Sequence, residues 1–243
     1  MKNVISIFCL PYEIDDLELT IRQLKSAYKY LEEPKDWYLH VNMCMADDMI
    51  DWKHSEMPKG YFEDKFNQIM DNCEFSNAHW SNDLDEIKGC VSHRRSTLEK
   101  YKDADYFLWL DTDIIFEDTT LAWLETAIKT TTIDYPYSII TPEIVRVWDS
   151  SWDCLVNEEF KNKPLDYQKT NDPYKDSGVR GSVSIESVSN SSYNQPRYKF
   201  AGGWFTCISG HLLRKLGVPK SLGHYGLEDT FIMHGAEKLM RLK

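Results

Sequence analysis

The sequence has no apolar run of the length that a membrane-spanning helix requires. A helix needs about 20 apolar residues to cross a bilayer, whereas the N-terminal apolar run, residues 4–10, ends at Pro11. This run is too short for the hydrophobic region of a secretory signal, and no small-residue cleavage site follows it. We therefore expect no transmembrane segment and assign residues 4–10 to a buried strand.

Basic residues are scarce relative to acidic ones. There are 28 Lys and Arg against 39 Asp and Glu, which gives a formal net charge of −11. Nucleic-acid binders need a basic footprint to displace counterions from phosphates, and anionic lipids attract polybasic segments. The composition thus argues against both partners, and an anionic substrate would need a local cation at its site.

The cysteines form no metal-binding or redox pattern. No CxxC and no Cys/His cluster at zinc spacing occurs. The six cysteines are scattered at positions Cys9, Cys44, Cys73, Cys90, Cys154 and Cys207. Because disulfides are rare in the cytosol, we expect reduced thiols and a cytoplasmic protein.

Hydrophobic periodicity predicts a layered α/β fold. Hydrophobic residues make up 42% of the chain, which excludes a disordered protein. Residues 4–10 and 37–44 are continuous apolar runs typical of buried strands. Between them, apolar residues from Ile14 to Leu31 recur every three or four positions, as on one face of a helix. A strand–helix–strand opening implies parallel strands.

Similar patterns predict the remaining elements. We expect strands at 72–80, 106–110, 137–141 and 199–209, and helices within 45–70 and at 83–101, 119–130, 210–216 and 226–240. Ser81 or Asn82 is the expected N-cap of the helix at 83–101. Residues 149–198 are polar, which predicts a solvated, flexible insertion.

The sharpest chemical signal is a pair of aspartates, Asp111 and Asp113, directly after the apolar run 106–110. Side chains alternate along a strand, so these two would share a face. Unpaired carboxylates there would repel each other, and a hard cation such as Mg²⁺ or Mn²⁺ removes that cost and bridges to phosphates. Ligands bind at the carboxyl ends of strands in open α/β sheets. We expect a metal site, with a plain turn as the alternative.

Two weaker signals lie nearer the C-terminus. Glu228 and Asp229 stand at the start of a predicted helix, where acidic residues are favoured in any case but where a carboxylate can also act as a general base. Gly202 and Gly203 precede Trp204 within a predicted strand. Glycines in a strand indicate either a bulge or the close approach of a ligand.

In this order, the motifs resemble those of GT-A-fold, nucleotide-sugar-dependent glycosyltransferases of the family 2 type. The motifs are PYE after the first strand, LWLDTD near residue 110, AGGWF near 202 and GLED near 228. The resemblance implies a Rossmann-like, three-layer α/β/α sandwich with a mixed, mostly parallel sheet. It implies a single domain over 1–243, with a donor half at 1–118 and an acceptor half at 119–243 that contains the insertion.

The resemblance also implies the roles of particular residues. The family's DxD motif matches Asp111 and Asp113, which would hold Mn²⁺ or Mg²⁺ on the diphosphate of a UDP- or GDP-sugar. The nucleoside would contact a set of residues after the first two strands: Pro11, Tyr12, Glu13, and Asp47 or Asp48. The sugar site, for a carbohydrate or glycoconjugate acceptor, would be lined by Gly202, Gly203 and Trp204.

The acidic pair Glu228 and Asp229 matches the family's ED pair. In inverting members the aspartate deprotonates the acceptor hydroxyl, which would make this chain an inverting hexosyltransferase with Asp229 as the base. Many members place a histidine metal ligand after this pair, where the sequence offers His234. Five helical residues turn through about 140° relative to the starting face, so His224 is a comparable candidate. The segment MADDMIDW at 45–52 replaces the family's usual Asp-Gly-Ser turn.

Several residues have two interpretations. Arg94 and Arg95 precede the DxD strand, where one of them would neutralise phosphate unless both are surface residues. Trp148, Trp152 and Trp204 would stack on sugar rings unless they belong to the core.

Two rival functions remain at this point. A haloacid-dehalogenase-like phosphatase would use Asp111 as nucleophile and Asp113 as acid/base. Its motif normally follows the first strand, and Ile115 stands where it has Thr or Val. The second rival is a non-catalytic carbohydrate-binding module, which would have little reason to keep both acidic pairs.

Overall fold

The structure is a computed structural model that describes residues 1–82, 87–134, 136–141, 204–224 and 226–241. The chain divides into two compact units, Met1–Ile140 with Gly203–Glu228, and Thr141–Gly202 with Asp229–Lys243. Across the described ranges, none of the helices combines the length and the apolar character that crossing a membrane requires.

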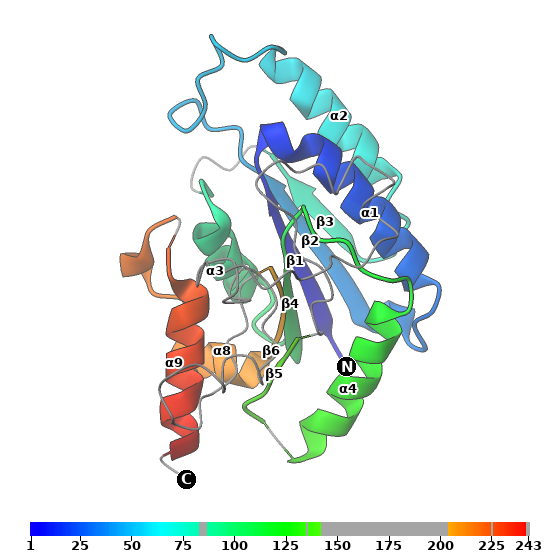
Figure 1. Ribbon diagram of the computed structural model, residues 1–243, viewed down its shortest axis with the longest axis vertical. Coiled ribbons are helices and arrows are strands. Elements are labelled where there is room, and N and C mark those ends of the chain that lie inside the picture. The colour runs from blue at the N-terminus through cyan, green and yellow to red at the C-terminus, as the bar shows by residue number, and fades with distance from the viewer. Residues whose placement is uncertain (83–86, 135, 142–203, 225, 242–243) are drawn as a thin grey trace, which may run out of the picture. The chain divides into compact units, whose positions relative to one another are not determined.

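The first unit is built on one six-stranded sheet (Figure 1). Its strands are β1 (Asn3–Cys9), β2 (Trp37–Met43), β3 (Ala78–Ser81), β4 (Tyr106–Leu110), β5 (Ile139–Ile140) and β6 (Phe205–Ser209). The spatial order is β3-β2-β1-β4-β6-β5. The first four strands pair in parallel, and β6 runs antiparallel to both of its neighbours. The predicted α/β class with a mixed, mostly parallel sheet is therefore confirmed.

Helices and short 3₁₀ turns connect these strands. The helices of the first unit are α1 (Ile14–Tyr28), α2 (Lys59–Asp71), α3 (Cys90–Lys100), α4 (Thr120–Asp134) and α8 (Gly210–Leu216). The 3₁₀ turns are η1 (Pro11–Glu13), η2 (Pro34–Asp36) and η3 (Lys220–Leu222). Helix α9 (Glu228–Arg241) begins at the last residue of the first unit and continues into the second.

The predicted start of the helix at 83–101 was wrong. Residues 87–89 are not helical and residues 83–86 lie outside the described part, so α3 begins only at Cys90. Gly89 stands before the helix in place of the expected caps. The Ser92 hydroxyl accepts from the Gly89 amide at 3.1 Å and donates to its carbonyl at 2.9 Å. The bond to the Gly89 amide satisfies a donor that has no partner within the helix.

Other predicted bounds change less. Helix α1 ends three residues before Leu31, and β3 is shorter than 72–80 because only four residues pair with β2. The predicted strand at 199–209 is described from Trp204, with β6 beginning at Phe205. The predicted insertion at 149–198 lies outside the described residues.

The two faces of the sheet differ in character. On β1, Ile5, Ile7 and Cys9 join the main hydrophobic core with residues of α1, α2 and α4. The side chain of Ser6 alternates to the other face, where its hydroxyl donates to Thr97 of α3 at 3.2 Å. Figure 1 shows α1, α2 and α4 on one side of the strands and α3 on the other. The α3 side is thus the more polar one.

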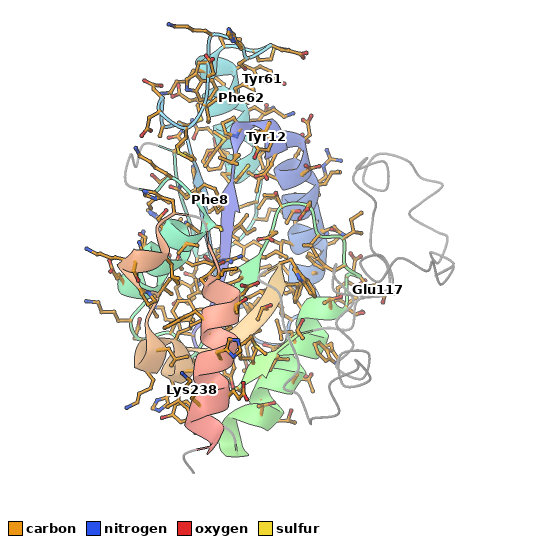
Figure 2. The ribbon with its side chains drawn as sticks, turned by 60° about the vertical axis from the view of Figure 1, so that its left-hand side comes forward. Phe8, Tyr12, Tyr61, Phe62, Glu117 and Lys238 are labelled. Atoms are coloured by element: carbon orange, nitrogen blue, oxygen red, sulfur yellow. The ribbon has the colours of Figure 1, made fainter. Side chains whose placement is uncertain are left out.

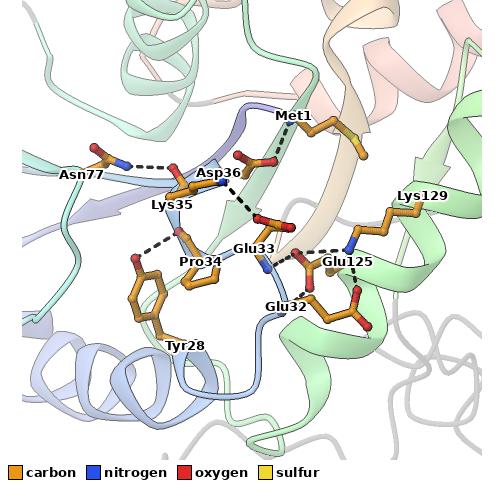
Figure 3. A network of polar contacts seen from close by, with 10 residues as sticks. All are labelled: Met1, Tyr28, Glu32, Glu33, Pro34, Lys35, Asp36, Asn77, Glu125 and Lys129. Carbon is orange, nitrogen blue, oxygen red and sulfur yellow. Dashed lines mark hydrogen bonds and ion pairs between the residues drawn. The ribbon is translucent and has the colours of Figure 1, made fainter.

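A buried carboxylate ties the turn between α1 and β2 to α4 (Figure 3). Glu125 of α4 is 3% exposed. Its two oxygens accept from the backbone amides of Glu32 at 2.8 Å and Glu33 at 3.1 Å. Lys129 bonds Glu32 at 2.7 Å. Because the carboxylate satisfies two amides of a turn, it fixes how the chain enters β2.

Candidate functional site

The site is organised by the carboxyl ends of two parallel neighbours, β1 and β4, which lead into η1 and the Asp111–Asp113 turn at one edge of the sheet (Figure 1). The Asp111 amide donates to the carbonyl of Trp204 at 2.9 Å. The buried Thr112 offers its carbonyl to the hydroxyl of Thr20 on α1. Hydrogen bonds from two sides therefore hold the turn in place.

Four carboxylates influence one another at this edge. The pKa of Asp113 is raised to about 7, first by burial, then by the charge of Asp111, and less strongly by Glu13 and Asp16. Burial also raises the pKa of Glu13; the Leu10 amide, which donates to its carboxylate at 2.8 Å, opposes this, and Asp111 adds to it. Concentrated negative charge in a partly buried place favours a bound cation.

The carboxylates of Asp111 and Asp113 fit a divalent cation, but only as part of its ligand set. Within the described ranges, no group of three or more His, Cys, Asp or Glu side chains is arranged to hold a metal. Mg²⁺ is commonly bound by one or two carboxylates together with substrate phosphates and water. The donor set here suits that mode, in which the substrate supplies the remaining oxygens.

Arg94 is the cation that the site itself supplies. From α3, its Nη2 donates to Asp111 Oδ1 at 3.1 Å, and its Nη1 donates to Glu228 Oε1. The guanidinium lies over the ring of Trp109, 4.6 Å from the centroid, in a geometry that attracts cations. Arg94 is therefore not a surface residue, and its predicted role in neutralising phosphate stays a prediction.

The two ion pairs of Arg94 differ in burial. The Arg94 and Glu228 side chains are 6% and 4% exposed, whereas the Asp111 side chain is 44% exposed. Breaking a buried pair by removing one partner costs about 3–5 kcal/mol, while a pair in contact with water contributes about 0.2–1 kcal/mol. Glu228 is therefore the more strongly held partner of Arg94, and Asp111 is the more accessible one.

Glu228 is held differently from a free general base. One oxygen accepts from Arg94, and the other, Oε2, is buried with no hydrogen-bond partner among the described residues. Such an oxygen is costly to leave unsatisfied. Its neighbour Asp229 belongs to the second unit, where its Oδ1 accepts from the Thr230 amide at 2.6 Å at the start of α9. The role of Asp229 as a base stays a prediction.

The two histidines considered as metal ligands each have a polar neighbour. His234, on the part of α9 in the second unit, is 71% exposed and lies 3.6 Å from Glu237. His224, in the first unit, directs its Nδ1 to the Ser92 hydroxyl at 3.1 Å. A third metal ligand from either histidine stays a prediction.

The residues expected near the nucleoside occupy the segments after β1 and β2. Pro11 is buried in η1, whereas Tyr12 is 74% exposed (Figure 2). Lys59 pairs with Asp47 at 2.9 Å. Asp48 pairs with Lys88, and this hydrogen bond is the main cause of its lowered pKa. Since Lys88 stands two residues before α3, this pair brings Asp48 to the start of that helix.

The guanidinium of Arg95 bonds backbone carbonyls, and its predicted role at a phosphate stays a prediction. Its Nε and Nη2 donate to the carbonyls of Val218, Pro219 and Gly223 at 2.8, 2.9 and 3.2 Å. Trp204 is half-buried and contacts the core. The glycine pair at 202–203 and both Trp148 and Trp152 lie outside the described residues.

Three residues of the candidate site were not identified from the sequence. Trp109 supports Arg94, Asp16 adds to the negative potential, and Lys88 pairs with Asp48. The position of Lys88 was hidden because the sequence places it inside a helix that actually begins after it. Asp16 stands three residues after Glu13, and this spacing is the one signal that could have joined it to the site.

Comparison with known proteins gives no further assignment: no protein-family model and no curated protein matches this chain.

Proposed function

We propose that this chain is a metal-dependent, inverting hexosyltransferase of the GT-A type, with a three-layer α/β/α fold. It would move a sugar from a UDP- or GDP-sugar to a hydroxyl of a carbohydrate or glycoconjugate. The observation that carries the proposal is the paired carboxylates Asp111 and Asp113 at the carboxyl end of β4, beside the buried guanidinium of Arg94. Paired carboxylates with an adjacent fixed cation suit a diphosphate held through a divalent cation.

Each part of the site has a task in this proposal. Mn²⁺ or Mg²⁺, when bound, stabilises the negative charge that develops on the leaving diphosphate. Asp111 and Asp113 hold the cation, and Arg94 supplies a preorganised positive charge whose planar fork matches phosphate oxygens. Its orientation costs little when the donor arrives, because Glu228 and Trp109 already fix the guanidinium.

The remaining assignments concern the nucleoside and the acceptor. The exposed ring of Tyr12, with Pro11, Glu13 and Asp47 or Asp48, would contact the base and ribose. Gly202, Gly203 and Trp204 would border the donor sugar. Asp229 would take the proton of the acceptor hydroxyl as it attacks the anomeric carbon.

The phosphatase alternative gains one supporting observation. An acid/base group works best with a pKa near the operating pH, and the pKa of Asp113 is about 7. The first step of that chemistry needs a nucleophilic carboxylate at Asp111, yet Arg94 donates to one of its oxygens. Release of inorganic phosphate from phosphate monoesters would favour this alternative over sugar transfer.

The decisive experiment is isothermal titration with UDP and GDP in Mn²⁺ and in EDTA. We expect binding that requires the metal and that falls at least tenfold in Asp111→Asn and in Asp113→Asn. Asp103→Asn is the matched control, because Asp103 is 73% exposed and precedes β4 instead of following it. Metal-independent binding that both substitutions leave unchanged would remove the metal role.

Transfer itself is tested with a panel of nucleotide sugars and carbohydrate acceptors. Asp229→Asn should abolish transfer and leave donor binding largely intact. NMR of the product should show an inverted anomeric configuration; retention would exclude the inverting assignment. Binding of carbohydrate without any transfer would instead indicate the non-catalytic module.

A further inference from the structure

The guanidinium of Arg94 bonds two carboxylates that differ in their exposure to water. Its Nη1 edge bonds the buried Glu228, while its Nη2 edge bonds Asp111, whose side chain is 44% exposed. The first contact is shielded from water and the second lies where a ligand can reach it. A ligand can therefore reach the Nη2 edge of the guanidinium but not its Nη1 edge.

We propose that Asp111 exchanges Arg94 for the divalent cation, and that Arg94 then turns its freed Nη2 edge to the donor diphosphate. This inference rests on the proposed function and assigns Arg94 as a donor-binding residue that couples metal binding to donor binding. Before the donor arrives, Arg94 neutralises Asp111. After the exchange, Asp111 would bind the cation. Arg94 would keep its hydrogen bond to Glu228 and donate to the phosphate with its Nη2 edge.

Charge at the site explains why such a device is needed. Asp111, Glu13 and Asp16 all raise the pKa of Asp113, so this edge is strongly negative without a counterion. An anionic diphosphate would be repelled by an unneutralised site. A resident guanidinium removes part of the repulsion at all times, and a divalent cation held by Asp111 would offset the charge of the incoming diphosphate.

The surroundings of Arg94 suit an exchange in place. Glu228 holds one edge, and the face of Trp109 supports the guanidinium plane at 4.6 Å. A planar guanidinium fixed at one edge can present its other edge to either a carboxylate or a phosphate, since both accept paired N–H donors.

The test measures two affinities separately. Mn²⁺ alone is titrated by EPR, and UDP or GDP, whichever the wild type binds, is titrated calorimetrically in saturating Mn²⁺. The variant Arg94→Gln with Glu228→Gln removes both charges of the buried pair and so avoids leaving one buried charge unpaired. We expect Mn²⁺ alone to bind at least threefold tighter, because its competitor for Asp111 is gone. The nucleotide should bind at least tenfold weaker.

A rise in Mn²⁺ affinity together with a fall in nucleotide affinity is the result that the exchange predicts. A second variant, Arg94→Lys, keeps one charge but loses the fork. It should leave Mn²⁺ affinity within about twofold of wild type and still weaken the nucleotide. Arg95→Gln is the control for a general disturbance of α3, and it should leave the ratio of the two affinities unchanged.

The outcomes separate the two proposals. If both affinities fall together in the paired variant, or if neither changes, the exchange is wrong while the glycosyltransferase proposal stands. If wild-type protein shows no Mn²⁺-dependent nucleotide binding at all, the proposed function itself fails.

Discussion

The imidazole rings of His40 on β2 and His93 on α3 lie with their centroids 5.1 Å apart. The Thr97 hydroxyl lies 3.1 Å from His40 Nδ1 and 3.5 Å from His93 Nε2. Both histidines are almost fully buried. Burial lowers the pKa of His40 to about 3 and that of His93 well below its usual value, with further lowering of the His40 pKa by Lys100 and of the His93 pKa by Arg94.

These histidines should make the fold sensitive to acid. In the unfolded chain they bind protons as pH falls through about 6.5, whereas His40 in the folded state stays neutral until about pH 3. The unfolded state thus binds more protons in this window, so stability falls as pH decreases, by about 1.4 kcal/mol per pH unit for each such histidine. Urea unfolding at pH 7, 6, 5 and 4 measures this slope.

His40→Gln should reduce the slope of the free energy of unfolding against pH by the contribution of one histidine, about 1.4 kcal/mol per pH unit. This holds whatever the substitution does to stability at pH 7. The control is His54→Gln, because the His54 side chain is 77% exposed and meets water in both states. An equal reduction in both variants would contradict the assignment to the buried pair.

The start of α8 packs so closely against the backbone before β4 that Gly210 should not tolerate a side chain. The Gly210 amide donates to the Asp105 carbonyl at 2.6 Å, and a Cβ at this position would meet the Ala104 carbonyl oxygen at 2.0 Å. We expect Gly210→Ala to lower the free energy of unfolding by at least about 1–3 kcal/mol, since the obstacle is backbone that must shift.

Gly60 gives the matched substitution. It lies in the first turn of α2, and a Cβ there would meet nothing within 4 Å. Gly60→Ala should raise stability by a few tenths of a kcal/mol, up to about 1, because alanine favours the helix and restricts the unfolded chain. Denaturant melts of the two variants should therefore shift in opposite directions, and shifts in the same direction would contradict the packing argument.

Local patterns were sufficient for much of this fold. The apolar run at 106–110 coincides with β4, and the predicted helix at 210–216 coincides with α8. Both are bounded by strong signals, Asp111 after the strand and Gly217 after the helix. The start of α3 could not be found in this way, because the spacing of Leu84 and Ile87 continues the helical pattern beyond the true start at Cys90.

The candidate site was predictable only where its residues are neighbours in sequence. Asp111 and Asp113 follow a strand and can be placed from the sequence alone. The pairing of Arg94 with Glu228 joins residues 134 positions apart, and no periodicity indicates it. Trp109 was likewise hidden, because one strand of five apolar residues does not show which ring supports a cation.

Glu125 should stabilise the fold mainly through its two hydrogen bonds to backbone amides and less through ion pairing. Its two oxygens accept from two different amides, those of Glu32 and Glu33, and glutamine would present an NH₂ group to one of them. We expect Glu125→Gln to lower the free energy of unfolding by about 1–3 kcal/mol. Lys129→Met is the control: it removes the ion pairs of Lys129 to Glu32 at 2.7 Å and to Glu125 at 3.8 Å, leaves both amide bonds in place, and should cost less than about 1 kcal/mol. If Lys129→Met is as costly, the ion pairs and not the amides would be responsible.

Arg95 should stabilise the segment before α9 and should not bind the substrate. Its three hydrogen bonds end on the carbonyls of Val218, Pro219 and Gly223, which a single lysine ammonium cannot reproduce in one plane. We expect Arg95→Lys to speed limited proteolysis within residues 217–224 and to lower stability by about 1–3 kcal/mol. Nucleotide affinity should stay within about twofold of wild type. Arg22→Lys, at a side chain that is 66% exposed, is the control and should change neither property. Normal proteolysis combined with weaker nucleotide binding would instead make Arg95, like Arg94, a phosphate ligand.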